Sequence, residues 1–346
     1  MIIHGHPEPQ NPTRVVVLGG SGFVGRNLLR RLATVGSDSV APLSRELDLS
    51  APEGAHLLAT LLKPTDAVVM LAASNSGARL DPDSFVANAA MGAAFCKAVR
   101  TAGCSHIVYL STDAVYPFKA EPIHEDVEPV PTSLYALMHL AREAMLRRLQ
   151  GPPIAILRVA QVYGAGDPHG AYGPGRMVRS ALREGRIVLY GAGQETRDHI
   201  HVDDVTSVIL DALRMRSQGL VNVATGCSTS FAALADLVVR ACGGSITIEH
   251  EPPLMPVLHR SFDTTALETA FPSRSNTALR DGIRLLVSEE LRTVSAPGSL
   301  RGQARRADIP DQECNGSGET VRSRDPEKQR VAAHSSPSLP EPDSSR

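Results

Sequence analysis

Several features that mark particular protein classes are missing from this 346-residue sequence. It contains no tryptophan, 4% of its residues are aromatic, and 35 lysines and arginines nearly balance 37 aspartates and glutamates. A formal charge of −2 excludes the basic footprint of a nucleic-acid binder, so we expect no nucleic-acid partner. The five cysteines are scattered and odd in number, and their spacing suits neither a disulfide framework nor a metal site.

Long hydrophobic runs are missing as well. No stretch approaches the ~18 to 20 apolar residues that cross a bilayer, and the first residues lack the basic and apolar regions of a secretory signal. We therefore expect a soluble, cytoplasmic protein with no membrane partner. The apolar fraction of 42% is nevertheless sufficient for a large core.

Short β-branched runs alternate with longer helical patterns from residue 14 to about residue 292. The runs are VVVL (15–18), AVVML (67–71), HIVYL (106–110), IAILRV (154–159) and LVNVA (220–224). Strands separated by helix-sized segments form βαβ crossovers, which give a parallel sheet with helices on both faces. The sequence therefore predicts an α/β fold with a doubly wound parallel sheet.

The two ends of the chain lack this alternation. Residues 1–13 carry three prolines among polar residues and are expected to form a flexible arm. Residues 293–346 are rich in Ser, Pro, Arg and Asp and show no apolar periodicity, so we expect a disordered tail.

A glycine-rich turn joins the first predicted strand to the first helical pattern. The sequence from Gly19 reads Gly-Gly-Ser-Gly22-Phe23-Val24-Gly25. Its three spaced glycines permit a tight turn, a close approach of backbone to a pyrophosphate and close packing of helix on strand. The helix amino terminus would face the anion. With a strand before it and a helix after it, the turn predicts a dinucleotide site, and a plain tight turn is the alternative.

The GxxGxxG spacing of this turn resembles the extended short-chain dehydrogenase/reductase family, in its NAD-dependent epimerase/dehydratase branch. The resemblance implies a Rossmann-type fold and an NAD or NADP cofactor. Ser44 and Arg45 would lie beside the adenosine ribose, where an arginine favours NADP(H), although Arg45 also suits a solvated surface position. Asp48 is similar to the family's aspartate that contacts adenine.

A second motif, Ser111-Thr112-Asp113, follows the predicted strand at 106–110. A hydroxyl at the carboxyl edge of a parallel sheet lies in the crevice where ligands bind. The resemblance gives Thr112 the contact to a substrate oxygen, with Ser111 beside it and Asp113 as a catalytic carboxyl group. Taken alone, the three residues more often form a helix cap or turn. Ala114 replaces the glutamate of the family's sugar dehydratases, which disfavours a 4,6-dehydratase.

Tyr135 and His139 occupy the positions of the family's Tyr-x-x-x-Lys. Residues four apart share a helix face, so a cation at the second position approaches both the tyrosine and the cofactor ribose. In the family this lysine lowers the pKa of the tyrosine, which then exchanges a proton near neutral pH. His139, neutral or half-charged near pH 7, can still donate to a ribose hydroxyl, but with a weaker field on Tyr135.

The match continues in the second half of the chain. Gln161 stands in for the asparagine of the family's LRxxNVYGP, Arg176 opens the next helical pattern, and Arg197 lies in a stretch similar to GxGxxxRDxxxVxDV. In the family the matching arginine pairs with the substrate diphosphate, which suits a bidentate guanidinium. A salt bridge to a nearby aspartate is the alternative. His199 and His201 lack a convincing third ligand, so we predict no metal site.

Together the motifs predict a Rossmann domain over residues 14–165 and a smaller substrate-binding part over 166–292, with some segments returning to the first sheet. The predicted function is an NAD(P)-dependent nucleotide-sugar epimerase or 4-ketoreductase. Hydride would move between nicotinamide and a sugar carbon while Tyr135 handles the proton. The resemblance also implies a homodimer paired through helices, in which Met138 and Leu149 are candidates for an apolar face. The rival hypothesis is a catalytically impaired cofactor-binding protein, suggested by His139.

Overall fold

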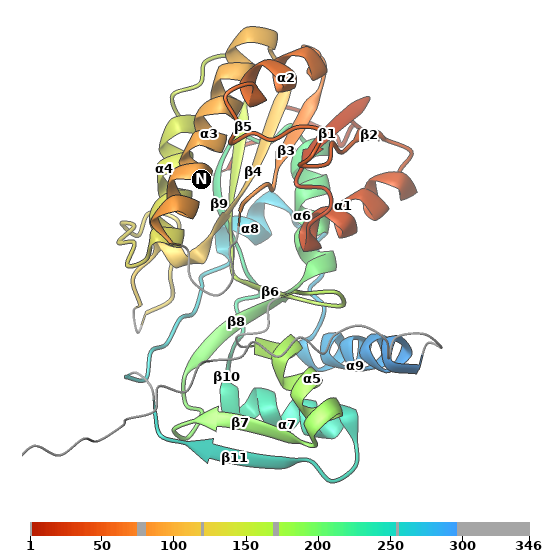
Figure 1. Ribbon diagram of the computed structural model, residues 1–346, viewed down its shortest axis with the longest axis vertical. Coiled ribbons are helices and arrows are strands. Elements are labelled where there is room, and N and C mark those ends of the chain that lie inside the picture. Colours follow the sequence, from red (N-terminus) through yellow and green to blue (C-terminus); the bar gives the residue numbers. More distant parts are fainter. Residues whose placement is uncertain (1, 75–80, 119–120, 169–172, 254–255, 296–346) are drawn as a thin grey trace, which may run out of the picture. The chain divides into compact units, whose positions relative to one another are not determined.

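The structure is a computed structural model (Figure 1). It describes residues 2–74, 81–118, 121–168, 173–253 and 256–295. Most of the expected tail, residues 296–346, lies outside these ranges, while residues 293–295 end the last helix, α9 (Leu279–Ser295). Among the described residues, no helix is long and apolar enough to cross a bilayer.

Six parallel strands form the central sheet, which confirms the predicted α/β class. Their order is β2-β1-β3-β4-β5-β9 (Figure 1). Because β2 and β3 lie on opposite sides of β1, the strand order reverses there, and such a switch point leaves a crevice for ligands at the carboxyl ends of the strands. The bounds are β1 (Arg14–Leu18), β2 (Asp38–Val40), β3 (Ala67–Met70), β4 (His106–Thr112), β5 (Ile154–Val159) and β9 (Gly219–Val223).

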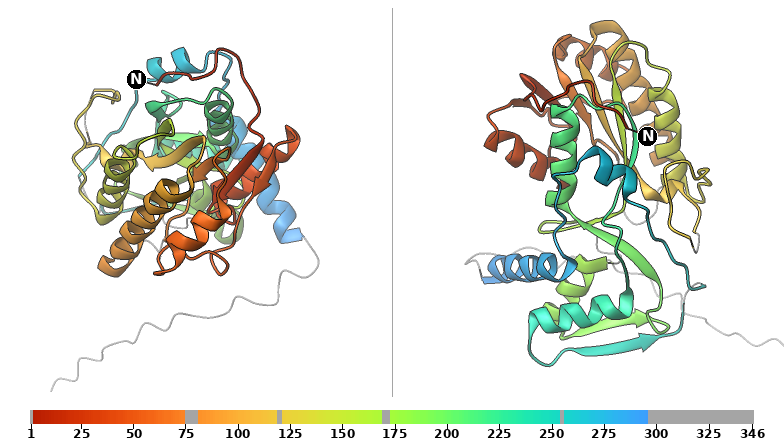
Figure 2. Two further views of the ribbon diagram at one scale, coloured as in Figure 1. Left: turned by 90° about the horizontal axis from the view of Figure 1, so that it is seen from above. Right: turned by 180° about the vertical axis from the view of Figure 1, so that it is seen from behind.

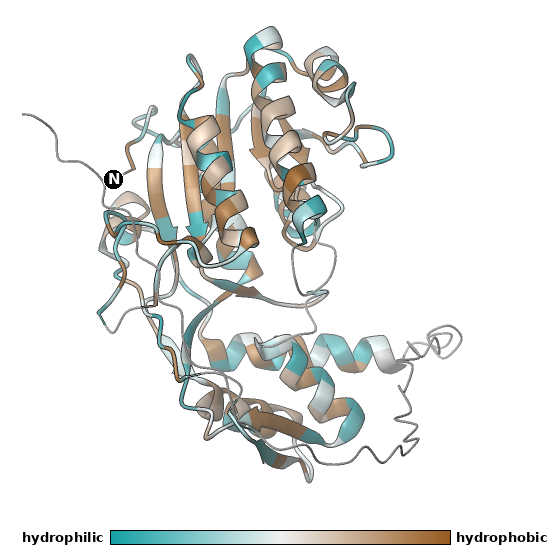
Figure 3. Ribbon diagram, turned by 60° about the vertical axis from the view of Figure 1, so that its left-hand side comes forward, coloured by the Kyte–Doolittle hydropathy of each residue, from teal (hydrophilic) through white to brown (hydrophobic). Residues whose placement is uncertain are grey.

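Helices cover both faces of this sheet, and alternate strand residues belong to separate cores (Figure 1, Figure 2). In β1, Val15 and Val17 belong to one core, and Val16 and Leu18 belong to the other. Burial on both faces explains why the strands are continuous apolar runs, coloured brown in Figure 3. The helices are α1 (Phe23–Thr34) and α6 (Val202–Arg214) on one side, and α2 (Gly54–Leu61), α3 (Pro82–Ala102) and α4 (Leu134–Leu146) on the other.

Two small sheets and three helices, α9 among them, build a smaller part with its own core of residues such as Met177, Leu189 and Leu234. Two later elements, α6 and β9, belong to the large sheet and its helices. A short helix, α8 (Thr265–Ala270), also packs near β9. The other elements of the smaller part are β6 (Gln161–Tyr163), α5 (Gly173–Glu184), β7 (Arg186–Tyr190), β8 (Thr196–His201), β10 (Ser228–Ser230), α7 (Phe231–Cys242) and β11 (Thr247–Glu251).

The first residues differ from the flexible arm that the sequence analysis expects. Ile2 is buried, and Ile3 pairs with Gln218 through N–H···O bonds of 2.8 and 2.7 Å. The His4 imidazole lies 2.9 Å from the hydroxyl of Ser217, which is 213 residues away along the chain. Proline spacing cannot reveal partners so distant in sequence, so the local pattern was misleading.

Burial keeps three imidazole side chains neutral. Desolvation of the charged form lowers the pKa of His106 and His199 to about 4 and that of His139 to about 3. In the unfolded chain a histidine binds a proton below about pH 6.5. The unfolded state therefore binds more protons than the folded state between about pH 6.5 and 4, and stability falls as the pH decreases through this window.

We predict that urea unfolding loses stability between pH 7 and pH 5, by up to about 1.4 kcal/mol per pH unit for each desolvated histidine. His106 Nε2 lies 2.7 Å from the Ser217 carbonyl oxygen, and the amide of a glutamine can replace that bond. His106→Gln should therefore flatten the dependence on pH. His56→Gln, at an exposed position of α2, is the matched control and should leave the slope unchanged. Equal slopes in all three proteins would contradict the prediction.

Candidate active site

The turn between β1 and α1 requires glycine at two positions. Gly19 has φ +88°, and a Cβ atom there would lie 2.7 Å from the backbone nitrogen of Ala72. A Cβ atom at Gly25 would lie 2.2 Å from the carbonyl oxygen of Gly19. These close backbone approaches are the ones that the glycine spacing predicts.

The amino end of α1 has the character of an anion site. Gly22 is its cap residue, and Phe23 and Val24 begin the helix. No side chain caps this end, and no acidic residue lies in its first turn. Among the described residues, these N–H groups therefore have no side-chain acceptor. Free N–H groups and the positive end of the helix dipole fit a pyrophosphate.

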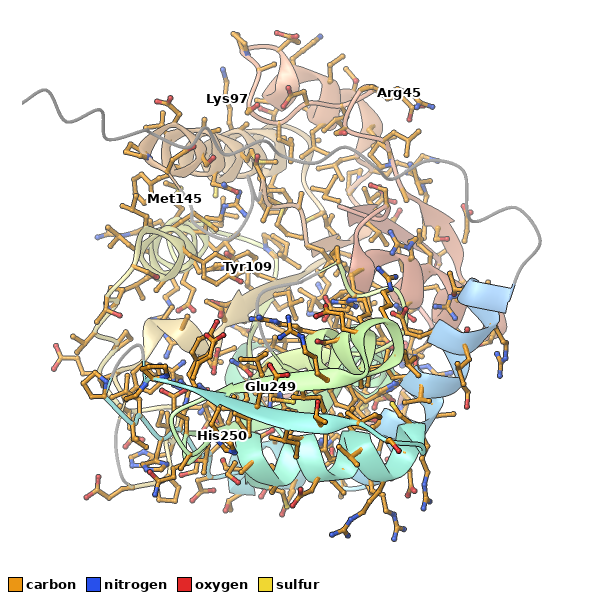
Figure 4. The ribbon with its side chains drawn as sticks, turned by 60° about the horizontal axis from the view of Figure 1, so that its bottom comes forward. Arg45, Lys97, Tyr109, Met145, Glu249 and His250 are labelled. Carbon is orange, nitrogen blue, oxygen red and sulfur yellow. The ribbon has the colours of Figure 1, made fainter. Side chains whose placement is uncertain are left out.

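Ser44, Arg45 and Asp48 are exposed in the segment after β2. The Arg45 side chain points outward (Figure 4). The Asp48 carboxylate accepts hydrogen bonds from the backbone nitrogen and the hydroxyl of Ser50, at 2.8 and 2.6 Å, and these bonds lower its pKa. Asp48 therefore holds the turn that leads to α2, and whether it also contacts an adenine stays a prediction.

Ser111 has a hydrogen-bond partner inside the protein, and the substrate contact that the sequence analysis expects stays a prediction. Its hydroxyl donates to Glu143 at 2.6 Å, and Glu143 also accepts from Arg158 at 2.9 and 2.7 Å. All three side chains are buried. Successive residues of a strand point to opposite faces, so Ser111 faces α4. The resemblance to the family motif had predicted that the hydroxyls of Ser111 and Thr112 both lie at the substrate site.

Thr112 and Asp113 lie where β4 ends. The Thr112 hydroxyl accepts from the Ala114 nitrogen at 3.2 Å and so caps a short 3-10 helix, η1 (Asp113–Val115). Asp113 forms a buried ion pair with Arg260, at 3.1 Å. Burial raises the pKa of Asp113, and the Arg260 charge opposes that rise. Asp113 is thus committed to a guanidinium, which the sequence analysis did not anticipate.

Two guanidiniums share the ring of Phe118. The Arg260 carbon Cζ lies 4.1 Å from the ring centroid and that of Arg197 lies 4.8 Å from it. Arg197 also donates to the carbonyl oxygen of Leu258 at 2.6 Å, and its Nη2 lies 3.7 Å from a carboxylate oxygen of Glu195. Glu195 is thus an acidic neighbour of Arg197 that the sequence analysis, which named only the nearby aspartates, did not offer. Arg176 is half-buried in the first turn of α5.

Gln161 and His199 are neighbours across β6 and β8, and both carry buried polar atoms. Within the described part of the chain, Gln161 Oε1 and both ring nitrogens of His199 have no hydrogen-bond partner. The His199 ring packs edge-on against Phe231, with centroids 6.2 Å apart. Buried polar atoms seldom stay unsatisfied, so this pair suits the polar groups of a ligand. The described residues hold no cluster of three or more His, Cys, Asp or Glu side chains fit for a metal.

Tyr135 and His139 lie together on α4, which begins after Ser133. Their rings pack edge to face, with centroids 4.7 Å apart. His139 is buried, and its Nδ1 lies 2.8 Å from the hydroxyl oxygen of Tyr109 on β4. Burial and the Arg142 charge lower the pKa of His139 to about 3, so the imidazole is neutral at pH 7. The weak positive field that the sequence analysis allowed for His139 is therefore absent.

Sequence reasoning missed Tyr109, Arg142 and Arg260 as parts of this region. Arg142 follows Tyr135 by seven residues, a helical spacing that places both on one face. Arg260 lies in an Arg-Ser-Phe-Asp stretch, residues 260–263, far along the chain from the other motifs. Both signals were present in the sequence, but only the fold shows which side chains they meet.

We predict that Gly25→Ala weakens NADH binding at least tenfold, because the new methyl group forces the carbonyl of Gly19 out of the turn. Overpacking of this kind also costs about 1–3 kcal/mol of stability. NADH fluorescence titration and urea unfolding measure the two effects. Gly36→Ala is the control, because a Cβ there meets nothing within 4 Å although φ is +70°. It should cost stability without changing NADH affinity, and equal NADH affinity in Gly25→Ala and wild type would contradict the account.

Comparisons with known proteins agree with this geometry. The model of the NAD dependent epimerase/dehydratase family matches residues 15–224. The chain is 31% identical over 303 residues to a UDP-glucose 4-epimerase of Mycolicibacterium smegmatis, covering 78% of this chain and 96% of that protein. It is 29% identical to dTDP-6-deoxy-L-talose 4-dehydrogenase (NAD(P)(+)) of Kitasatospora kifunensis, with 79% and 90% covered. The crystal structure of Thermus thermophilus UDP-glucose 4-epimerase with NAD superposes with a TM-score of 0.71 at 27% identity, covering 80% of this chain and 98% of that one.

Proposed function

The chain belongs to the NAD-dependent epimerase/dehydratase family, and from this premise we propose that it is a nucleotide-sugar 4-epimerase. The observation that carries the proposal is the shared carboxyl edge of the sheet. The glycine turn follows β1, Thr112 ends β4, and Tyr135 lies in the first turn of α4, which packs against β4 and η1. The relatives are named as enzymes, so they give no support to the catalytically impaired alternative.

The turn after β1 fits a nicotinamide dinucleotide. Gly19, Gly22 and Gly25 would admit the pyrophosphate, and the uncapped start of α1 at Phe23 and Val24 would bind it. When bound, the nicotinamide supplies the hydride chemistry. The named relatives include one with NAD and one described for NAD(P)(+). We propose that Ser44 and Arg45 flank the adenosine ribose and that Asp48 lies at the adenine.

Tyr135 would handle the proton of the reacting sugar hydroxyl. Its phenolate accepts that proton as the sugar carbon is oxidised and returns it when the carbon is reduced from the other face. Thr112 would hold the sugar oxygen through its hydroxyl. His139, neutral and bound to Tyr109, would position the Tyr135 ring by the edge-to-face contact. Because Asp113 forms an ion pair with Arg260, we propose that it holds that guanidinium and does not act as a catalytic acid.

The two guanidiniums on Phe118 would bind the diphosphate. Both guanidiniums lie at one ring, so a single diphosphate can reach both of them. Asp113 already pairs with Arg260, and a diphosphate adds more negative charge than one carboxylate and accepts bidentate hydrogen bonds. We propose that Arg197 and Arg260 bind it, and that Gln161, His199 and Arg176 contact other polar groups of the nucleotide sugar.

The homodimer is a proposal that rests on the family resemblance. Met138 and Leu149, which the sequence analysis offered as an apolar face, are buried in the core of the chain itself. Exposed apolar side chains on the same pair of helices are Leu137 of α4 and Val86 of α3. These are the residues through which a helix-paired dimer would form.

We predict that the protein supplied with NAD interconverts UDP-glucose and UDP-galactose, and that Tyr135→Phe lowers the rate by a factor of about 10² or more, because no side chain then exchanges the proton. Proton NMR of the two sugars measures the ratio. Tyr190→Phe, at an exposed tyrosine, is the control and should keep the full rate. Undiminished activity of Tyr135→Phe would contradict the assignment. Oxidation of added NADPH by a 4-keto sugar, without interconversion, would favour a 4-ketoreductase.

We predict that Arg45→Ala weakens NADPH binding about tenfold and leaves NADH binding unchanged, because only NADPH carries a 2′-phosphate for the guanidinium. Fluorescence titration of the nicotinamide measures both affinities. Arg240→Ala, at an exposed site of α7, is the charge-matched control and should change neither affinity. Equal NADPH affinity in Arg45→Ala and wild type would place Arg45 at the surface without a cofactor role.

A further inference from the structure

Arg142 is an unusual charge in this fold. Its side chain is among the largest that are fully buried, with an exposed fraction of 2%. The guanidinium donates to three oxygen atoms, which are the carbonyl oxygen of Asn88 at 2.9 Å, the Asn88 side-chain oxygen at 3.0 Å and the carbonyl oxygen of Ala72 at 2.8 Å, and it also interacts with the neutral Tyr109 hydroxyl. All three acceptors are neutral. Among the described residues, Arg142 forms no ion pair with a carboxylate.

The nearest acidic residue on α4 has other partners. Glu143 binds the guanidiniums of Arg158 and Arg147, at 2.7 and 3.1 Å, and accepts from the Ser111 hydroxyl. A buried guanidinium without an anion is unfavourable, because hydrogen bonds to neutral acceptors replace only part of its hydration. Such a charge is retained more readily where an anion forms beside it.

Arg142 lies on the face of α4 that carries Tyr135 and His139. Helical side chains lean toward the amino terminus, so the side chain of Arg142 points back toward these two residues. Tyr109 of β4 lies in the same group, with its hydroxyl 2.8 Å from His139 Nδ1 and its ring centroid 5.9 Å from that of His139. The Arg142 charge contributes to the lowered pKa of His139 and opposes the raised pKa of Tyr109.

We propose that Arg142 is a positioning residue that supplies, from the protein interior, the positive charge that stabilises the phenolate of Tyr135. This charge would replace the one that His139 does not carry. The inference rests on the proposed function only in giving this phenolate a role in catalysis. The ionisation of Tyr135 itself can be measured on the protein without substrate.

The other groups around Tyr135 and Arg142 leave this role to Arg142. On β4, the Tyr109 hydroxyl interacts with Arg142, but burial still raises the pKa of Tyr109, so that phenol stays protonated. On η1, Asp113 is paired with Arg260. On α3, Asn88 and Met91 contact the guanidinium, and neither titrates. On α4, His139 is neutral and Glu143 is paired, so Tyr135 is the remaining group in this set that can ionise against the charge.

The charge is also fixed with respect to the cofactor turn. Arg142 donates to the oxygen of Ala72, and the nitrogen of Ala72 lies against the α-carbon of Gly19, where no Cβ fits. A buried cation held by backbone is screened little by salt. The proposed stabilisation of Tyr135 should therefore be insensitive to ionic strength, unlike that from a surface lysine.

Tyrosinate absorbance near 295 nm tests the proposal on the protein without cofactor or sugar. The pH titration of wild type minus that of Tyr135→Phe isolates Tyr135 among the six tyrosines. We expect a midpoint at least about one pH unit below the ordinary tyrosine value of about 10, and the same midpoint in 0.05 and 0.5 M NaCl. A wild-type midpoint at or above 10 overturns the proposal without any change to Arg142.

Variants then separate charge from packing. Arg142→Gln should raise the Tyr135 midpoint by about one pH unit or more, and Arg142→Lys, which keeps the charge, should stay close to wild type. Arg148→Gln removes an exposed cation just after the end of α4 and should leave the Tyr135 midpoint unchanged. A second cation in His139→Lys/Arg142→Gln should bring the midpoint back down.

Thermal unfolding shows whether each variant is folded. If Arg142→Gln does not fold, the wild-type midpoint and the Arg142→Lys midpoint still decide the matter. A folded Arg142→Gln with an unchanged midpoint refutes the proposal. Since the titration needs no substrate, absence of epimerase activity would refute the proposed function and leave this result standing.

Discussion

The backbone of Ala72, just beyond β3, is the point at which the two sides of the candidate active site meet. Its nitrogen faces Gly19 so closely that a Cβ atom there would lie 2.7 Å away. Its carbonyl oxygen accepts a 2.8 Å hydrogen bond from the buried Arg142 of α4. The backbone of this one residue therefore contacts the glycine turn through its nitrogen and anchors the helix that carries Tyr135 through its oxygen. These two contacts link the start of α1 to α4.

Buried ion pairs hold the remaining elements of the edge in place. Glu143 and Arg158 join α4 to β5, and Asp113 and Arg260 join η1 to the segment after β11. Breaking such a pair leaves an uncompensated charge, so each pair fixes one arrangement of its elements. Arg142 differs from these because its acceptors are neutral, and the anion that would complete it is the Tyr135 phenolate. In this account the positive charge near Tyr135 comes from the helix interior, with a neutral imidazole at the position that faces the tyrosine.

The fold and the glycine turn after β1 could be predicted from the sequence because their signals are local. Short apolar runs predict parallel strands buried on both faces, and the glycine spacing indicates the close contacts at Gly19 and Gly25. The errors came from features that depend on distant residues. The partner of Ile3 is Gln218, and the neutrality of His139 follows from its burial against Tyr109 and Arg142. The partner of the Ser111 hydroxyl, Glu143, is also 32 residues away, although strand alternation already separates Ser111 from Thr112.

The central claim is that a sugar carbon is oxidised and reduced again within one site while Tyr135 holds its proton. UDP-glucose deuterated at C4, given to the protein with NAD, tests this most directly. The account predicts UDP-galactose that still carries deuterium at C4, because the hydrogen returns to the carbon from which it came. Loss of that deuterium to water, or its appearance in added NAD without any UDP-galactose, would contradict the account.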